Sequence, residues 1–190
     1  MMALEYPNPI NWHNFALAQD YYARHNFKYI EVPWLAPAEI MHITFPGEYR
    51  FKTELGDLIA SGEQAFLYLE SKNKLDPGRY MTITPCFRDE EETKFNFKQF
   101  MKLELYITDS VTLENLQKTI SICKDLLENI LNGPIEIVSM LDGSFDLEYQ
   151  KIELGSYGIR EYRGHKWIYA TGLAEPRTSQ VKNIYKEHIK

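Results

Sequence analysis

Hydrophobic residues recur at alternating three- and four-residue spacing between residues 110 and 132, the clearest pattern in the chain. The positions are Leu113, Leu116, Ile120, Cys123, Leu127 and Ile130. This period places them on one stripe of an α-helix that faces a core. Gly133 and Pro134 then end the helix. The same pattern assigns Cys123 to the core as a small apolar residue.

Weaker patterns predict the elements before this helix. Asn11 can cap a helix that runs to about Arg24. Its apolar side is expected to be Trp12, Phe15, Ala16 and Tyr22. Residues 27–32 favour a strand that Pro33 stops. Residues 45–61 predict short strands joined near residues 55–57, and residues 63–72 predict a short helix closed by a turn at residues 76–78.

The segment from residue 81 to residue 107 predicts a hairpin of two strands joined by the polar loop 89–94. Because side chains alternate across a strand, each strand has two distinct faces. One face is apolar, with Met81, Ile83, Pro85 and Phe87 on the first strand and Met101, Leu103, Leu105 and Ile107 on the second. The other face carries Thr82, Thr84, Cys86 and Arg88 on the first strand and Phe100, Lys102, Glu104 and Tyr106 on the second.

The polar face of this hairpin has two interpretations. Its charged residues, with the neighbouring loop, are Arg88, Lys98, Lys102 and Glu104. An ordinary solvent-facing surface explains these charges. It explains less well why the Phe100 ring stands among them, or why Thr82, Thr84 and Cys86 are small and leave room. The residues alone therefore leave a ligand-binding face and a solvent face both open.

The rest of the chain predicts strands around residues 135–140, 145–157 and 165–171, and a last helix from about Pro176. Strands arranged in hairpins between single helices are typical of an α+β fold with a largely antiparallel β-sheet flanked by helices. No low-complexity linker divides the 190 residues. We therefore expect a single domain over residues 1–190 with a substantial core.

Composition excludes several classes of protein. With 44% hydrophobic and 25% charged residues, the chain is neither disordered nor expected to cross a membrane. Its net charge of −6 does not favour a general nucleic-acid coat, although one local basic pocket stays open. Residues 1–12 lack the features of a signal peptide. The two cysteines imply no disulfide framework and suit the reducing cytoplasm, and no Cys/His cluster has zinc-ligand spacing.

Residues 86–104, which read CFRDE, a loop and then KQFMKLE, resemble motif 2 of the class II aminoacyl-tRNA synthetases. The ending is closest to the seryl type, within the seryl, threonyl and prolyl branch. The resemblance implies that Arg88 holds the α-phosphate of ATP, that Glu90 contacts the adenine end and that Phe100 stacks on the adenine ring. Lys102 and Glu104 fall where the family touches its amino-acid substrate.

Three further segments resemble other motifs of this family in the expected order. Residues 26–33 resemble motif 1, which implies contacts in a homodimer. Residues 61–63 resemble the family's Thr-x-Glu loop, which implies that Glu63 receives the α-amino group of the substrate. A common turn is the alternative. Residues 172–177 resemble motif 3, which implies that Arg177 holds the γ-phosphate of ATP, helped by the helix N-terminus. This segment departs from the motif because Ala174 and Glu175 stand where glycines are usual.

The segments 145–148 and 153–156 resemble the two strands that precede motif 3. The resemblance implies that Glu153 and Ser156 hold Mg²⁺ on ATP, and an exposed glutamate with a turn serine is the alternative. Strict alternation would place these two side chains on opposite faces of a strand. Gly155 between them permits a bulge that brings both to one face.

The resemblance implies ATP-dependent activation of an amino acid, or a similar carboxylate, as its adenylate with release of pyrophosphate. Arg88 and Arg177 would be the catalytic residues, with ATP and Mg²⁺ bound. No protein nucleophile is needed, because the step requires charge neutralisation and alignment. The acceptor stays open between tRNA, a carrier protein and a small amine, since no segment predicts a separate tRNA-binding domain. The alternatives are a non-catalytic paralogue used for binding or dimerisation and, less favoured by charge, a nucleic-acid-binding module.

Overall fold

A seven-stranded β-sheet forms the centre of the protein, whose computed structural model describes residues 9–47 and 49–187. The strand order is β1 (Lys28–Tyr29), β5 (Arg79–Phe87), β6 (Gln99–Ile107), β10 (His165–Glu175), β9 (Ile152–Tyr162), β8 (Phe145–Tyr149) and β7 (Glu136–Ser139). Every neighbouring pair is antiparallel except β1 with β5. This confirms the expected α+β fold with a largely antiparallel sheet. Residues 1–8, part of the segment considered above for a signal peptide, lie outside the described residues.

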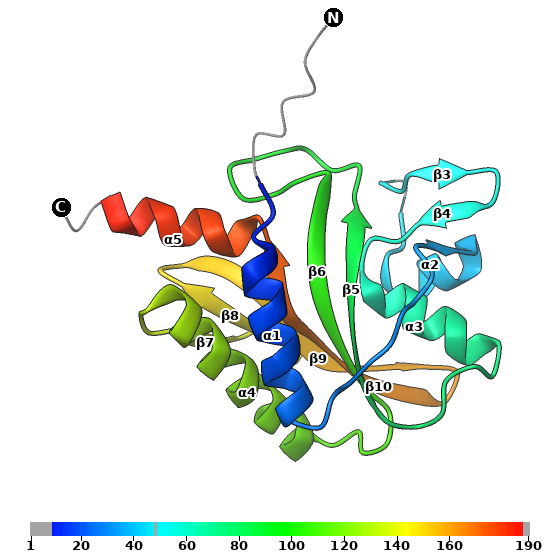
Figure 1. Cartoon of the computed structure of the whole chain (residues 1–190). Coiled ribbons are helices and arrows are strands. Elements are labelled where there is room, and N and C mark those ends of the chain that lie inside the picture. The colour runs from blue at the N-terminus through cyan, green and yellow to red at the C-terminus, as the bar shows by residue number, and fades with distance from the viewer. Residues whose placement is uncertain (1–8, 48, 188–190) are drawn as a thin grey trace, which may run out of the picture.

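Helices cover both faces of this sheet (Figure 1). On one face lie α1 (Trp12–Arg24) and α4 (Leu113–Leu131), and on the other lie α2 (Ala38–Thr44) and α3 (Gly62–Ser71). A small three-stranded sheet lies beside α2 and α3 and consists of β2 (Leu35–Ala36), β4 (Gly56–Leu58) and β3 (Lys52–Thr53). The last helix, α5 (Arg177–Glu187), follows β10 directly. Of the helices described, none combines the length and the apolar character needed to cross a membrane.

Each face of the sheet has its own core. The larger core packs α1 and α4 against the apolar side of β6, β9 and β10, including Leu103, Leu105 and Ile168. The second core packs α3 against Tyr106 and Trp167, both fully buried. The sheet is therefore buried on both sides, and polar groups within it need partners inside the protein or a ligand.

The pattern between residues 110 and 132 predicts α4 correctly, with one correction at its start. Thr112 caps the helix by accepting a hydrogen bond from the backbone of Asn115, so the helix begins at Leu113 rather than at residue 110. Leu113 is 56% exposed because it lies in the first turn, beyond the edge of the core. Cys123 is buried, as expected. Burial raises the pKa of its thiol to about 12, which keeps it protonated and unreactive.

Asn11 caps α1 as expected, but the buried side of this helix differs from the prediction. Phe15 and Tyr22 are buried, whereas Trp12 and Ala16 are exposed and Ala18 takes the core position instead. The prediction for Trp12 was wrong: it lies at the first helical position, where its ring is near Phe15 but stays 59% exposed.

Several strand bounds also differ from the sequence-based prediction. Only Lys28–Tyr29 of the predicted strand 27–32 is a strand, since the chain then leaves β5 and crosses to the small sheet. The region 145–157 forms β8 and the start of β9, and β10 continues to Glu175 rather than ending near residue 171. Helix α2 was not predicted at all. It has only seven residues and begins after Pro37, too short for a periodic pattern to indicate.

The hairpin of β5 and β6 confirms the two predicted faces. Thr82 lies opposite Glu104, Thr84 opposite Lys102, and Cys86 opposite Phe100. Most apolar residues of the other face join the larger core, whereas Pro85 and Phe87, at the end of β5, are not part of it. The polar face therefore points to the side of α3, where the candidate site lies.

Two bulges adjust this region of the sheet. In β9 the extra residue is Leu154, between Gly155 and Glu153, and in β10 it is Gly172, between Thr171 and Leu173. A bulged residue shifts the alternation by one position. Glu153 and Ser156 are three positions apart, but the extra residue Leu154 lies between them. Their side chains therefore point to the same side of β9, as those of residues two apart do in a regular strand.

We expect Gly155→Ala to destabilise the protein by about 1–3 kcal/mol. A Cβ atom at Gly155 would lie 2.5 Å from Cβ of Thr171 on the neighbouring strand, so one strand must move. Urea unfolding of the wild type and variant measures the change in the free energy of unfolding. Ser139→Ala on the exposed edge strand β7 is the control, with a change within about 0.5 kcal/mol expected. Equal stability of Gly155→Ala and wild type would contradict the close approach of the strands.

Candidate active site

A pocket opens where the β5–β6 hairpin, the bulges of β9 and β10 and the start of α5 meet. Its lining is mainly polar and comprises Arg88, Glu90, Asn96, Phe97, Phe100, Lys102, Glu153, Leu154, Gly155, Ser156, Thr171, Ala174, Glu175 and Arg177. All six residues that the sequence suggested for ATP are in this lining: Arg88, Glu90, Phe100, Glu153, Ser156 and Arg177. These six residues come from four separate stretches of the chain, and the fold brings them together in one pocket.

Arg88 is held in a fixed position just after β5. Its Nε donates a hydrogen bond to the backbone oxygen of Ala60 at 3.2 Å. Its guanidinium also lies 5.2 Å from the ring centroid of Phe100 and 5.8 Å from that of Phe45. A guanidinium restrained in this way presents its remaining donors to the pocket without a large loss of side-chain entropy on binding.

Arg177 fixes the loop of the hairpin to the start of α5. Its Nε donates to the backbone oxygen of Phe95 at 2.9 Å, and its Nη2 donates to Oδ1 of Asn96 at 3.1 Å. Its Nη1 lies 3.6 Å from Oε1 of Glu153. Burial lowers the pKa of Arg177; the negative charge of Glu153 opposes this effect, and the positive charge of Arg88 adds to it. Two arginines that repel each other in one pocket favour a bound anion between them.

The polar loop contributes residues that the sequence did not single out. Asn96 and Phe97 line the pocket, and Asn96 bonds Arg177. No sequence pattern marks these two residues, because the position of a loop residue depends on which elements the loop packs against.

Glu153 and Ser156 fit the expected magnesium site in chemistry. The bulge at Leu154 brings both to the pocket, and the Glu153 side chain is about half exposed there. One carboxylate and one hydroxyl supply two hard oxygen ligands, which suits Mg²⁺ when phosphates and water provide the others. Among residues 9–47 and 49–187, no group of three or more His, Cys, Asp or Glu is placed to hold a metal ion.

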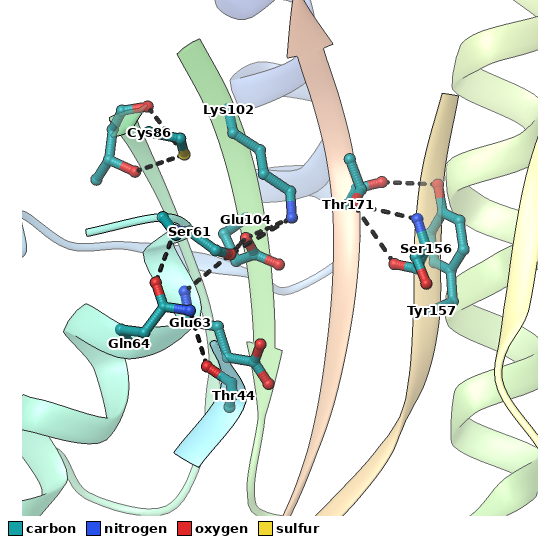
Figure 2. A network of polar contacts seen from close by, with 12 residues as sticks. Thr44, Ser61, Glu63, Gln64, Cys86, Lys102, Glu104, Ser156, Tyr157 and Thr171 are labelled. Atoms are coloured by element: carbon teal, nitrogen blue, oxygen red, sulfur yellow. Dashed lines mark hydrogen bonds and ion pairs between the residues drawn. The ribbon is translucent and has the colours of Figure 1, made fainter. Parts of the chain in front are cut away.

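A buried polar network adjoins the pocket through Lys102 (Figure 2). Nζ of Lys102 lies 2.8 Å from Oε2 of Glu104, and the Ser61 hydroxyl donates to the same oxygen. Ser61 also caps α3, where it accepts from the backbone N–H of Glu63. The other oxygen of Glu104, Oε1, is buried and has no hydrogen-bond partner in the described chain.

Glu63 lies behind this network rather than in the pocket lining. Its Oε1 accepts from Nε1 of Trp167 at 2.6 Å, and its Oε2 pairs with Arg160. Burial raises the pKa of Glu63, although Arg160 and Trp167 oppose this effect. Arg160 was not predicted as a site residue, because its position in β9 looks like that of any surface arginine on a strand.

The set of charged residues expected on the polar face of the hairpin needs one correction. Lys98 is not part of the lining described for the pocket. It precedes β6, its side chain is 46% exposed, and it pairs with Asp89 at 2.5 Å. Lys98 therefore lies on the outer surface of the loop, and the cations of the pocket are Arg88, Lys102 and Arg177.

The departure in the last motif has a structural explanation. Glu175 is fully buried, and its carboxylate accepts from Nδ2 of Asn14 at 2.7 Å and from the hydroxyl of Ser179 at 3.0 Å. It thus connects β10 to α1 and α5. Burial raises the pKa of Glu175, with these hydrogen bonds acting in the opposite direction. The Glu175 carboxylate is therefore bonded to other residues of the protein rather than directed at a ligand.

Comparison with known proteins identifies the family of this chain. A family described as "tRNA synthetases class II core domain (F)" matches residues 12–137, more than half of the chain. The protein therefore belongs to the class II aminoacyl-tRNA synthetase core family, as the motifs suggested. No curated protein matches the chain by sequence.

Solved structures of two synthetases share the fold. One is a pyrrolysyl-tRNA synthetase of Desulfitobacterium hafniense, with a TM-score of 0.73 and 18% identity over 90% of this chain. The other is the seryl-tRNA synthetase of Pyrococcus horikoshii complexed with ATP, with a TM-score of 0.73 and 19% identity over 90% of this chain. The chain spans 66% of the length of the first and 49% of the second. At this identity the likeness shows the fold and does not select a branch of the family.

Proposed function

We propose that this protein activates an amino acid, or a similar carboxylate, by forming its adenylate from ATP. The observation that carries the proposal is the convergence of Arg88, Phe100, Glu153 and Arg177 on one pocket. In the reaction, an oxygen of the substrate carboxylate attacks the α-phosphorus of ATP. The bond between that phosphorus and the oxygen bridging to the β-phosphate breaks, and pyrophosphate leaves.

Each of the six residues assigned to ATP has a proposed role. Arg88 neutralises the charge that develops on the α-phosphate, since its guanidinium is already fixed before the reaction. Arg177 binds the γ-phosphate, and Phe100 and Glu90 bind the adenine end. Mg²⁺ held by Glu153 and Ser156 would further neutralise the phosphates. No step needs a protein nucleophile or base, because the attacking carboxylate is already ionised at neutral pH.

The amino-acid subsite is proposed at the buried network next to the ATP pocket. Lys102 belongs to both, because it lines the pocket and pairs with Glu104. Glu63 lies on the far side of Glu104, at the start of α3. A substrate whose carboxylate reaches the α-phosphate near Arg88 would extend from Lys102 towards Glu104 and Glu63.

The acceptor of the activated acyl group is proposed to be a tRNA, a carrier protein or a small amine. The protein is further proposed to act as a homodimer in the cytoplasm. Dimerisation is supported by the motif 1 segment, where β1 is an edge strand, and by Trp34 directly after it, which is 55% exposed. The two buried free thiols, Cys86 and Cys123, are compatible with a reducing compartment.

A specific observation favours the second candidate, a non-catalytic paralogue used for binding or dimerisation. Both oxygens of Glu63, which the resemblance assigned to the substrate amino group, are already bonded within the chain. A crystal structure with ATP and Mg²⁺ separates the two candidates. Nucleotide stacked on Phe100 with its phosphates between Arg88 and Arg177 supports adenylate formation. A pocket that stays empty at millimolar ATP supports the paralogue.

We expect Glu153→Gln to raise the Mg²⁺ concentration that half-saturates the reaction by about tenfold or more. The amide keeps the shape of the side chain but removes the charge that attracts the cation. ATP–pyrophosphate exchange measured against a Mg²⁺ titration gives this value. Glu136→Gln on the exposed strand β7 is the control and should not change it. An unchanged Mg²⁺ requirement for Glu153→Gln would remove this residue from the metal site.

A further inference from the structure

Charged side chains of opposite sign follow one another along the sheet face beside the ATP pocket. Lys102 and Glu104 are two residues apart on β6, and Tyr106 follows at the next position on the same face. Side chains two residues apart on a strand lie about 7 Å from each other. Across the sheet, Glu104 lies opposite Thr171, and Tyr106 lies opposite Tyr169. The face therefore has a positive row, a negative row and an aromatic row, in order of distance from the phosphate-binding end.

Arg160 adds a second positive group at the aromatic row. It lies on β9 opposite Trp167, but its guanidinium reaches back over Tyr169, with Cζ 4.0 Å from the ring centroid. Gly158 is directly opposite Tyr169 and has no side chain to obstruct this position. The guanidinium of Arg160 thus lies one row beyond Glu104.

The position of Arg160 is fixed by two buried partners. Its Nη1 pairs with the Glu63 carboxylate, which Trp167 holds in place with a hydrogen bond. The Tyr169 ring supports the plane of the guanidinium through a cation–π contact. A guanidinium fixed on one edge and one face is preorganised to bind a ligand with its remaining edge.

That remaining edge of Arg160 is free to bind. In the described part of the chain, Nε and Nη2 of Arg160 have no hydrogen-bond partner, and the side chain is 37% exposed. Neighbouring N–H groups of a guanidinium match the two oxygens of a carboxylate. The free donors therefore favour an anionic, planar group.

The second observation comes from Glu104, whose carboxylate is used on one side only. Oε2 receives both the Ser61 hydroxyl and the Lys102 ammonium, whereas Oε1 is buried with no partner in the described chain (Figure 2). A buried carboxylate oxygen without a donor is costly, at about 1–3 kcal/mol. A cationic donor from a ligand would remove this cost, and an α-ammonium group is such a donor.

We propose that the substrate of this protein is an amino acid with a short acidic side chain, such as aspartate or glutamate. The α-carboxylate lies at Arg88 and Lys102, the α-ammonium at Oε1 of Glu104, and the side-chain carboxylate at Arg160. The signs of the three substrate groups match the three rows in order. Arg160 is then the residue that determines specificity, and Glu63 positions it. This inference rests on the proposed adenylate formation for the direction in which the α-carboxylate points.

The amides of these amino acids test the inference, because they have nearly the same shape without the side-chain charge. Charge-assisted hydrogen bonds are about twice as strong as neutral ones. One of the two carboxylate oxygens is an NH₂ group in asparagine and glutamine. This group is a donor and cannot accept a hydrogen bond from Arg160. We expect the acidic amino acid to bind at least about tenfold more tightly than its amide.

The experiment is isothermal titration of the full chain with L-aspartate, L-glutamate, L-asparagine, L-glutamine and L-serine, with a non-hydrolysable ATP analogue and Mg²⁺ present. ATP–pyrophosphate exchange is measured with the same five amino acids. Arg160→Gln is expected to abolish the preference for the acid over the amide, and Arg160→Lys to retain part of it. Arg163→Gln, on the same hairpin but outside the subsite, should keep the full preference. Thermal unfolding of each variant tests whether the fold is retained. If Arg160→Gln unfolds, Arg160→Lys is used in its place, because a lysine can still pair with Glu63.

The outcomes separate this inference from the proposed function. Selective binding of an acidic amino acid that depends on Arg160 supports the inference even if no exchange occurs, in which case adenylate formation fails instead. Exchange with serine or an amide, but not with either acid, overturns the inference and leaves adenylate formation in place. Binding of serine or an amide alone, without exchange, overturns both. Binding of none of the five, or a preference for the acid that Arg160→Gln leaves intact, also overturns it.

Discussion

Replacing Arg88 with alanine is expected to lower ATP–pyrophosphate exchange by about 1,000-fold or more, as for loss of a preorganised group that stabilises transition-state charge. Arg88 lines the pocket, and its guanidinium is fixed by Ala60, Phe45 and Phe100 before any substrate binds. The free-energy cost of fixing this guanidinium is therefore met when the protein folds and is not part of the activation barrier. The loss should appear mainly in kcat, because the α-phosphate gains charge in the transition state.

Stability should change little in this variant. Arg88 makes one hydrogen bond to Ala60, so its removal costs about 1 kcal/mol. Lys98→Ala is the matched control, a cation of the same hairpin that lies outside the pocket lining and pairs with Asp89. Exchange by Lys98→Ala should equal that of the wild type. Exchange by a folded Arg88→Ala protein at the wild-type rate would show that this arginine does not act on the α-phosphate.

Replacing Trp167 with alanine should destabilise the protein by about 3–5 kcal/mol, the range for a fully buried tryptophan. Trp167 is completely buried in the core below α3. Its ring stacks near Tyr106, and its Nε1 donates to Glu63. The variant loses packing and also leaves the buried Glu63 carboxylate with one oxygen unpaired, so both effects act in the same direction.

Urea unfolding measures this change, and Trp34→Ala is the matched control. Trp34 is the same residue type but is 55% exposed, so its replacement should change the free energy of unfolding by less than about 1 kcal/mol. Equal effects of the two substitutions would contradict the burial of Trp167. Trp167→Phe should fall between the wild type and the alanine variant, because it retains most of the packing and loses the hydrogen bond.

Local patterns were sufficient to predict the elements that carry most of the site. The period of α4 and the alternation of β5 and β6 are properties of short segments, and both were confirmed. Alternation also placed Arg88 and Phe100 on one face of the hairpin. It left open whether that face binds a ligand, and the proposed roles in binding ATP came from the family resemblance. The sequence further indicated that Gly155 permits a bulge, and the structure places the extra residue next to it, at Leu154.

Contacts between distant segments could not be predicted in the same way. The pair of Glu63 and Arg160 joins residues 97 positions apart, and the hydrogen bond from Trp167 to Glu63 spans 104 positions. No periodicity encodes such partners, because they are selected by sheet order and by the path of α3 across the sheet. For the same reason, Asn96 and Phe97 were missed in the pocket, and Lys98 was wrongly grouped with the charges that line it.

Glu175 shows how a departure from a motif can be explained once the fold is known. In the sequence, Glu175 stands where the motif usually has a glycine. In the structure, Asn14 and Ser179 occupy that carboxylate and direct it to α1 and α5. Glu175 therefore replaces the usual residue of the motif with a side chain that links β10 to α1 and α5.

The central claim is that the pocket of Arg88, Phe100, Glu153 and Arg177 forms an adenylate. The most direct measurement is ATP–pyrophosphate exchange by the purified full chain with Mg²⁺ and each of the 20 amino acids in turn. The claim predicts exchange that depends on one amino acid or a few closely related ones and is lost in Arg88→Ala. Absence of exchange with every amino acid, together with no detectable binding of ATP, would contradict it.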